Sequence, residues 1–226
     1  MTATPLTIDA GATRWSANEW DRAGRPLLVL LHGYGSDEDD LFALSPYLPL
    51  RPAIASLRAP IAEAGGHAWF SRAQFVDGTP TLERADAAAR AVLDWLDTLQ
   101  DGSGSSGASL TSPPRVGLLG FSQGGAMVLQ LMRLAPHRFA YGVQLSGYVV
   151  AGSAGGDTEL AGLRPPVFWG RGANDTVIGA TSIARTAQWL PEHASVDARI
   201  YEDAGHEITQ TELADIAAFI QAHLAA

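Results

Sequence analysis

The chain has 226 residues, of which 46% are hydrophobic and 17% charged, with a net charge of −9 and no cysteine. This length suits one buried core, so we expect a single domain over residues 1–226. The absence of cysteine excludes disulfides, thiolate zinc sites and a cysteine nucleophile. The negative charge argues against nucleic acid as a partner and against a standing attachment to anionic membranes. Because the N-terminus lacks a secretory pattern, we expect a cytoplasmic protein.

Short apolar runs alternate with helical patterns along most of the chain. This alternation predicts an α/β domain with a mainly parallel central sheet and helices on both faces. At the N-terminal end, two short pieces near Thr7 and Trp15 are expected to form an antiparallel hairpin at the sheet edge. The predicted buried strands that follow are, in chain order, Leu27–Leu31, Ala53–Leu57, Val116–Leu119, Gly142–Leu145, Val167–Trp169 and Val196–Tyr201.

Helical patterns lie between most of these strands. Apolar residues spaced three and four apart predict helices over Thr81–Gln100, from the Ser122 turn to about Leu134, over Ala180–Leu190 and over Glu207–Leu224. The Gly/Ser-rich segment of residues 102–114 is expected to be an elongated surface loop, and residues 151–163 a second irregular stretch. Since these elements use almost the whole length, we expect no cap domain.

The pattern Gly-x-Ser-x-Gly occurs at Gly120-Phe121-Ser122-Gln123-Gly124. It follows a predicted strand and opens a predicted helix, which is the context of a nucleophilic serine on a sharp turn. The turn would place the backbone amide of Gln123 at a helix N-terminus, where it can stabilise an oxyanion. The structural alternative is a capping serine in a glycine-rich helix start.

A second candidate loop, His32-Gly33-Tyr34-Gly35, directly follows the first buried strand. In folds with a nucleophile turn of this kind, such a loop supplies the second oxyanion donor. We expect the donor to be the backbone amide of Tyr34, and we expect His32 to be a structural residue that bonds within the loop. The acidic run that follows, residues 36–40, reads as a capped helix start and lacks the spacing of a calcium loop.

The acid and the base are expected after the serine, in the order Ser, Asp or Glu, His. His206 lies in the turn between the last predicted strand and the last predicted helix, where a base can reach over the sheet. Asp175 lies in the loop after Val167–Trp169, and its carboxylate could fix the tautomer of that imidazole. The rival acids Asp157 and Glu159 precede the strand, and Asp203 is expected to point outward.

The segments LHGYGSDEDDLFALSPYLP, AWF, GFSQGGAMVLQL, GRGANDTVI and AGHEIT resemble the phospholipase/carboxylesterase family of α/β hydrolases, which includes acyl-protein thioesterases. The resemblance covers nearly the whole chain, in the right order. It implies an α/β-hydrolase fold, a Ser122–Asp175–His206 triad and an oxyanion hole made by the amides of Tyr34 and Gln123. This sequence departs from the family at one place. The segment Trp169-Gly170-Arg171-Gly172 occupies the position where the family often has a His-Gly pair.

The resemblance implies hydrolysis of esters or thioesters. Since no cap domain is expected, the site should be open, which favours short to medium acyl chains or a long chain in a shallow groove. We expect a serine carboxylesterase that hydrolyses short- to medium-chain esters through an acyl-serine intermediate, with acyl-protein thioesterase or lysophospholipase activity as the alternative. Trp69 and Phe70 are expected beside the acyl site, unless they are plain core. The expected partner is a small-molecule ester or an acylated substrate, with no metal or other cofactor, and family members are monomers or homodimers. A catalytically inactive hydrolase fold that serves as a binding module is the alternative from another class.

Overall fold

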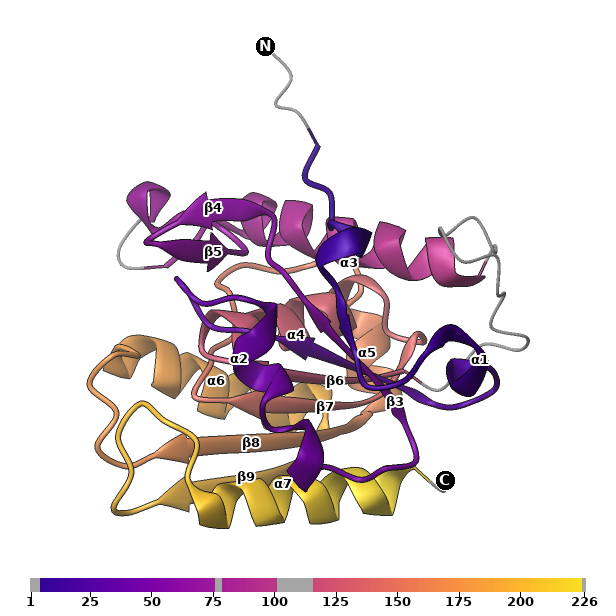
Figure 1. Ribbon diagram of the computed structural model, residues 1–226. Helices are drawn as coiled ribbons and strands as arrows, with labels where there is room; N and C mark the ends of the chain where they lie inside the picture. The colour runs from indigo at the N-terminus through magenta and orange to yellow at the C-terminus, as the bar shows by residue number, and fades with distance from the viewer. Residues whose placement is uncertain (1–4, 76–78, 101–115, 225–226) are drawn as a thin grey trace.

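A seven-stranded sheet crosses the molecule in the order β1-β3-β2-β6-β7-β8-β9 (Figure 1). This is a computed structural model, and it describes residues 5–75, 79–100 and 116–224. All neighbouring strands run parallel except β1, which is antiparallel to β3. The strands are β1 (Arg14–Trp15), β2 (Leu27–Leu31), β3 (Ala53–Leu57), β6 (Val116–Phe121), β7 (Phe139–Leu145), β8 (Pro166–Gly172) and β9 (Ser195–Tyr201).

Helices cover both faces of this sheet. The elements outside it are α1 (Glu19–Arg22), α2 (Glu38–Phe42), α3 (Leu82–Gln100), α4 (Gln123–Leu134), α5 (Asp157–Leu163), α6 (Ala180–His193), α7 (Gln210–His223) and a hairpin of β4 (Ile61–Glu63) with β5 (Gly66–Ala68). Buried residues of α3, α4, α5 and α6 share one hydrophobic cluster, and those of α2 and α7 share the other. In Figure 1, α3 accordingly lies above the sheet and α7 below it.

The central strands are buried on both faces. All five residues of β2 are buried, and alternate side chains enter opposite clusters: Leu27, Val29 and Leu31 pack on the α4 side, and Leu28 and Leu30 on the α7 side. A strand between two helical layers has no polar face, so a continuous aliphatic run is the expected sequence. The predicted α/β architecture is therefore confirmed, and the described part of the chain contains no separate cap domain.

The predicted N-terminal hairpin is wrong. Arg14 and Trp15 form an edge strand, but they pair with Ser56 and Ala55 of β3 rather than with residues near Thr7. The irregular stretch predicted over residues 151–163 is wrong in its second half, which forms α5. The pairing of β1 with β3 and the contacts of α5 with α4 and α6 involve distant segments, and local composition does not record them. The predicted Gly/Ser loop of residues 102–114 lies outside the described residues.

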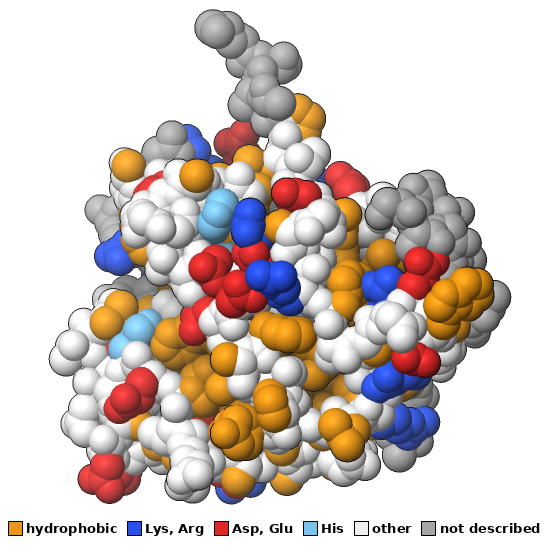
Figure 2. All heavy atoms as spheres, viewed as in Figure 1, with side chains coloured by type: hydrophobic (Ala, Val, Ile, Leu, Met, Phe, Trp, Pro, Cys, Tyr) orange, Lys and Arg blue, Asp and Glu red, His pale blue; other side chains and the backbone are white. Residues whose placement is uncertain are grey.

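The acidic run after the His32 loop starts a helix, as predicted. Asp37 caps α2 by accepting a hydrogen bond from the Asp39 amide. Arg14 pairs with Asp39, and Arg58 pairs with Glu38, and Figure 2 shows acidic and basic side chains side by side over α2. Within the described ranges no group of three or more His, Cys, Asp and Glu could hold a metal ion. In the same ranges, no helix has the length and apolar character to cross a membrane.

Candidate active site

Ser122 lies on the sharp turn between β6 and α4. Its backbone has φ 56° and ψ −114°, a conformation that a residue with a side chain adopts only under strain of order 1–3 kcal/mol. The turn is held by a hydrogen bond from the Ser122 amide to the Leu145 carbonyl at 2.8 Å. Glycine is required on both sides, because a Cβ on Gly120 would overlap the Gly124 backbone and one on Gly124 would overlap the Leu31 backbone. The nucleophile-turn context predicted from the pattern is present.

Three side chains from separate loops form one hydrogen-bonded row at the carboxyl edge of the sheet. His206 Nε2 lies 2.9 Å from Ser122 Oγ, and His206 Nδ1 lies 2.8 Å from Asp175 Oδ2. An ionised carboxylate can only accept, so Nδ1 carries the proton and Nε2 is left free to accept from the serine hydroxyl. The structure thus brings together the three residues that the sequence pointed to.

The Asp175 carboxylate is ionised and well supported. Burial by itself would raise the pKa of Asp175, but hydrogen bonds from His206 and from the amides of Ile178 and Val177 outweigh it and hold the pKa below its ordinary value. Those two amides donate to Oδ1 at 3.1 and 2.8 Å, which leaves Oδ2 for the imidazole. The side chain of Asp175 is 1% exposed and that of His206 is 16% exposed.

The loops that carry the acid and the base are tied to each other. The Asn174 amide donates to the Ala204 carbonyl at 2.9 Å, and the Asn174 side chain donates to the Glu202 carbonyl at 2.8 Å. The His206 ring also packs on Phe121, with ring centroids 4.8 Å apart. The relative position of carboxylate and imidazole is therefore set by contacts outside the pair itself.

The rival acids are engaged elsewhere or exposed. Asp157 pairs with the buried Arg133, and Glu159 lies 2.6 Å from His137. Asp203 is exposed, as expected. None of the three is the hydrogen-bond partner of His206 in the described structure.

The two predicted oxyanion donors flank the serine. Tyr34, Ser122 and Gln123 line the same small pocket of about 70 Å³. The Gln123 amide is in the first turn of α4, where amides have no partner inside the helix. The Tyr34 amide has no hydrogen-bond partner among the described residues. Two unused amides beside one hydroxyl are the arrangement that can hold a negatively charged oxygen.

Trp69 and Phe70 do not lie where the substrate prediction put them. Their side chains are 0% and 1% exposed and belong to the core, and they border a hollow with Pro5 and Leu6 rather than the pocket at Ser122. The contribution of this segment is through its backbone. The Trp69 amide donates to Gln123 Oε1 at 2.7 Å, and Gln123 Nε2 donates to the Phe70 carbonyl at 2.8 Å.

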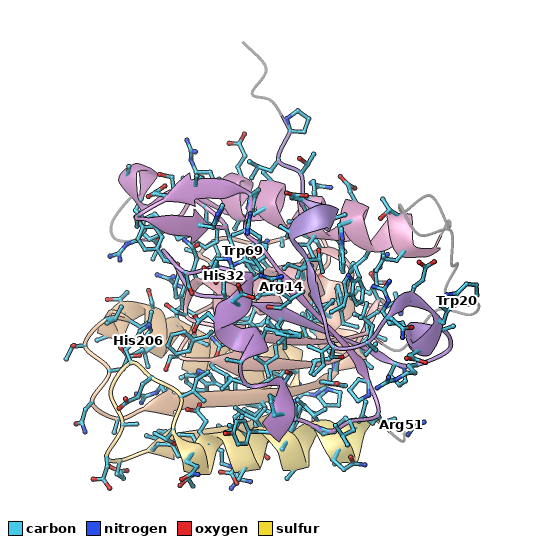
Figure 3. All side chains as sticks on the ribbon, viewed as in Figure 1. Arg14, Trp20, His32, Arg51, Trp69 and His206 are labelled. Carbon is cyan, nitrogen blue, oxygen red and sulfur yellow. The ribbon has the colours of Figure 1, made fainter. Side chains whose placement is uncertain are left out.

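His32 is a structural residue, as predicted. Burial lowers its pKa, so the ring is neutral; it accepts from the Ala59 amide at Nε2, 3.0 Å, which leaves Nδ1–H to donate to the Gly33 carbonyl at 2.7 Å. The Trp69 indole donates to the His32 carbonyl at 2.9 Å. Figure 3 shows His32 and Trp69 together behind α2, with His206 on a separate loop at the same side of the sheet. These bonds fix the loop that carries Tyr34.

Several residues that line the pocket were not predicted. They come from three loops and the start of α6, and they are Arg72, Phe75, Tyr148, Val177, Ile178, Gly179 and Ser182. Val177 and Ile178 end the GRGANDTVI segment, but no motif marks the other five, which only their place around the pocket distinguishes. The motifs in the sequence carry the reacting groups, while the shape of the pocket comes from loop packing.

Comparison with known proteins gives the family. The family described as phospholipase/carboxylesterase matches residues 17–224. The chain belongs to this family. A probable carboxylesterase of Oryza sativa subsp. japonica is 29% identical over 116 residues, which are 50% of this chain and 44% of that protein. The chain thus matches less than half the length of this curated relative.

Two further proteins are similar over nearly the full length of the chain. Acyl-protein thioesterase 1 of Saccharomyces cerevisiae is 23% identical over 217 residues, covering 88% of this chain and 93% of the yeast protein. The crystal structure of a carboxylesterase from Mesorhizobium loti has a TM-score of 0.76 at 22% identity and covers 96% of this chain and 99% of that one. The phospholipase/carboxylesterase fold therefore extends over almost the entire chain.

Proposed function

We propose that this protein is a serine carboxylesterase that hydrolyses short- to medium-chain carboxylic esters through an acyl-Ser122 intermediate. The observation that carries the proposal is the unbroken row of hydrogen bonds from Asp175 through His206 to Ser122, at 2.8 and 2.9 Å. A strained serine, an imidazole held between carboxylate and hydroxyl, and two free amides in one pocket serve acyl transfer and have no comparable structural purpose.

The first half of the reaction acylates the serine. Ser122 Oγ attacks the ester carbonyl carbon while its proton passes to His206 Nε2, and the carbonyl π electrons move onto oxygen. When the resulting tetrahedral species collapses, the bond from carbon to the alkoxy oxygen breaks and His206 gives its proton to the departing alcohol. Asp175 stays ionised and stabilises the imidazolium that forms between these steps.

The second half repeats the steps with water. His206 takes a proton from water as the water oxygen attacks the acyl carbon, and it returns that proton to Ser122 Oγ when the acyl–serine bond breaks. The carboxylic acid leaves. In both halves the amides of Tyr34 and Gln123 donate to the oxyanion, and removing one such donor typically costs about 3 kcal/mol of transition-state stabilisation.

Acyl-protein thioesterase activity is the second candidate, since the yeast relative with that name aligns over 93% of its length. The same residues would perform it, because a thiolate is a better leaving group than an alkoxide. Lysophospholipase activity, which uses the same chemistry, is a further alternative. The non-catalytic alternative has no supporting observation, as each residue of the proposed relay is in bonding position.

The substrate class, the location and the assembly of the protein are also proposed. The proposed partner is a small-molecule ester, the proposed location is the cytoplasm and the proposed assembly is a monomer or homodimer of a single-domain chain. The reaction as written needs no metal or organic cofactor.

Replacing Ser122 with alanine tests the proposal. Wild-type protein is expected to hydrolyse p-nitrophenyl butyrate and to be labelled by a fluorophosphonate probe, and Ser122→Ala is expected to do neither. Circular dichroism and thermal unfolding serve as the fold control. Hydrolysis retained by Ser122→Ala, or an unreactive wild-type serine, would exclude the proposed function.

A further inference from the structure

The pocket at Ser122 contains a buried phenol that the proposed reaction does not use. Tyr148 is 6% exposed and lines the pocket together with Ser122. Its hydroxyl makes no hydrogen bond to the described residues and is not among the fully enclosed unpartnered side-chain atoms, so a molecule in the pocket can reach it. The neighbouring backbone is fixed, because the Val149 amide donates to Thr186 Oγ1 at 2.9 Å. The Tyr148 hydroxyl is thus a donor on a fixed segment, with no protein acceptor among the described residues.

A guanidinium lies in the same pocket. Arg72 lines it with Tyr34 and Tyr148, and the Arg72 guanidinium carbon is 5.1 Å from the centre of the Tyr34 ring. Among the described residues no carboxylate is within ion-pair distance of this guanidinium. A ring face holds a cation in position while leaving its N–H groups free to donate.

The nearest candidate partner, Glu63, is already satisfied by neutral donors. Its Oε1 accepts from the Tyr34 hydroxyl at 2.8 Å and from the Arg72 backbone amide at 3.1 Å. Hydrogen bonds from the Ser71 side chain and from Tyr34 lower the pKa of Glu63, so it is ionised without the help of the guanidinium. The Glu63 carboxylate therefore orients the loop and the ring beneath Arg72 rather than neutralising the Arg72 side chain.

A second cation, Arg185, also acts on the phenol. Burial raises the pKa of Tyr148, while the charges of Arg72 and Arg185 act in the opposite direction. Arg185 is on α6, and its Nη1 contacts the Val149 carbonyl at 3.4 Å. Two positive groups from different elements face one unpartnered hydroxyl in a protein whose net charge is −9.

We propose that Arg72 and Tyr148, with Arg185 behind them, form a subsite for an anionic carboxylate, so that the preferred substrates are esters that carry a free carboxylate, such as monoesters of short dicarboxylic acids. The inference rests on the proposed esterase function of Ser122. Arg72 and Tyr148 are specificity residues in it. The carboxylate of the substrate accepts from the guanidinium and from the phenol, and the ester carbonyl lies at Ser122.

The test uses pairs of substrates that differ in charge and match in shape. Monoethyl succinate is compared with ethyl levulinate for an anion on the acyl side, and carboxymethyl butyrate with 2-methoxyethyl butyrate for an anion on the alcohol side. Released acid is followed by pH-stat titration. Wild type is expected to favour the anionic member of at least one pair in kcat/KM by about tenfold, the usual scale of one charge-assisted hydrogen bond. The substrate pair that shows the preference identifies whether the subsite binds the acyl part or the alcohol part of the ester.

Two variants link the preference to the subsite. Arg72→Gln is expected to reduce the anionic-to-neutral ratio of kcat/KM about tenfold, and Tyr148→Phe to reduce it severalfold. The ratio is taken within one protein, so a change in the folded fraction cancels. Arg22→Gln is the matched control, because Arg22 also stacks on an aromatic ring, with its guanidinium 3.7 Å from the centre of Trp15. It belongs to α1, on the opposite side of the molecule from His206 in Figure 3, and is expected to leave the ratio unchanged.

A binding measurement separates this inference from the esterase proposal. Succinate is titrated by calorimetry into the Ser122→Ala protein and into Ser122→Ala with Arg72→Gln. Binding that is lost with Arg72 supports the subsite whether or not the wild type hydrolyses esters. Wild-type hydrolysis with equal kcat/KM in both substrate pairs, or a ratio that Arg72→Gln does not change, overturns the subsite and leaves the esterase proposal intact.

Discussion

The Asp175 carboxylate divides its two oxygens between two tasks. Oδ1 accepts from the amides of Val177 and Ile178, which hold the loop, and Oδ2 accepts from His206. A single side chain therefore couples the conformation of its own loop to the tautomer of the base. Because these tasks use different atoms, a substitution can separate them.

Replacing Asp175 with asparagine is expected to lower kcat for p-nitrophenyl butyrate by about 10⁴-fold, the loss seen for this change in a Ser-His-Asp protease. The amide oxygen can still accept at the Oδ1 position, so the loop is retained. The amide nitrogen at the Oδ2 position would donate toward Nδ1 and so favour the tautomer that protonates Nε2. Steady-state kinetics measures the loss, and circular dichroism checks the fold.

Asp203→Asn is the matched control, since Asp203 is an exposed carboxylate three residues before His206. Its kcat is expected to stay within about twofold of wild type, as for surface changes away from a site. A loss of less than tenfold in Asp175→Asn, or an equal loss in both variants, would contradict the role proposed for Asp175.

Helix α4 approaches the sheet so closely that Gly124, in its first turn, has no room for a side chain. A Cβ on Gly124 would lie 1.8 Å from the Leu31 carbonyl oxygen of β2. The backbone of α4 must sit this close for the Ser122 turn to form directly from β6. Gly120 and Gly124 are therefore required because a side chain at either position would prevent α4 from packing against β2 and β6.

Two glycine-to-alanine changes in helices test this packing in opposite directions. Gly124→Ala is expected to lower the free energy of unfolding by several kcal/mol, because backbone must move to remove the overlap. A Cβ added at Gly162, in α5, would meet open space. Gly162→Ala is therefore expected to raise the free energy of unfolding by about 0.5–1 kcal/mol through helix propensity. Urea denaturation measures both. Equal effects of the two changes would show that the close approach of α4 is not required.

On the scale of the whole molecule, the α7 side of the core encloses a carboxyl group. Glu212 is 0% exposed, and neither of its oxygens makes a hydrogen bond in the described structure. Burial, with the nearby Asp215 carboxylate acting in the same direction, raises the pKa of Glu212 to about 7. The folded state therefore binds this proton more tightly than the unfolded chain does.

This group makes overall stability depend on pH. Since its folded pKa is above the unfolded value, its favourable contribution is complete below about pH 4.5 and is lost as the pH rises to about 7. Glu212→Gln is expected to unfold at higher urea than wild type at pH 8, by a free energy on the order of 3 kcal/mol, and to match it near pH 4.5. Urea titrations at several pH values measure the difference.

Glu192→Gln, at an exposed position of α6, is the control and is expected to follow wild type at every pH. A Glu212→Gln protein with the same pH dependence as wild type would show that this carboxyl group is ionised in the folded state throughout the range.

Much of the fold could be predicted from local pattern. The runs of β2 and β3 have the predicted bounds. The strand before Ser122 was predicted without its last two residues, and the strand before Asp175 without its first residue and its last three. The row of Ser122, Asp175 and His206 was predicted from their positions after the strands now seen as β6, β8 and β9, since parallel strands bring their carboxyl ends to one edge. The strand predictions succeeded because each depends on residues that are near one another in the chain, whereas the row was predicted from the order of the motifs along the chain.

The predictions that failed depend on distant partners. Trp69 and Phe70 are apolar in a pocket or in a core alike, and only the packing of α3 and α4 over them makes them core. Arg14 and Trp15 pair with β3 rather than with the nearer Thr7 region. Arg72 and Tyr148 carry no motif at all, and they reach Ser122 from different loops.

The sequence by itself determined the alternation of strands and helices and the choice and order of the proposed reacting groups, because periodicity and turn chemistry act over a few residues. The tertiary structure alone decided which side chains surround the serine, which apolar residues are enclosed and which charges meet. Those properties arise only when segments far apart in the chain pack against each other, because that packing decides which side chains are buried and which charges come into contact.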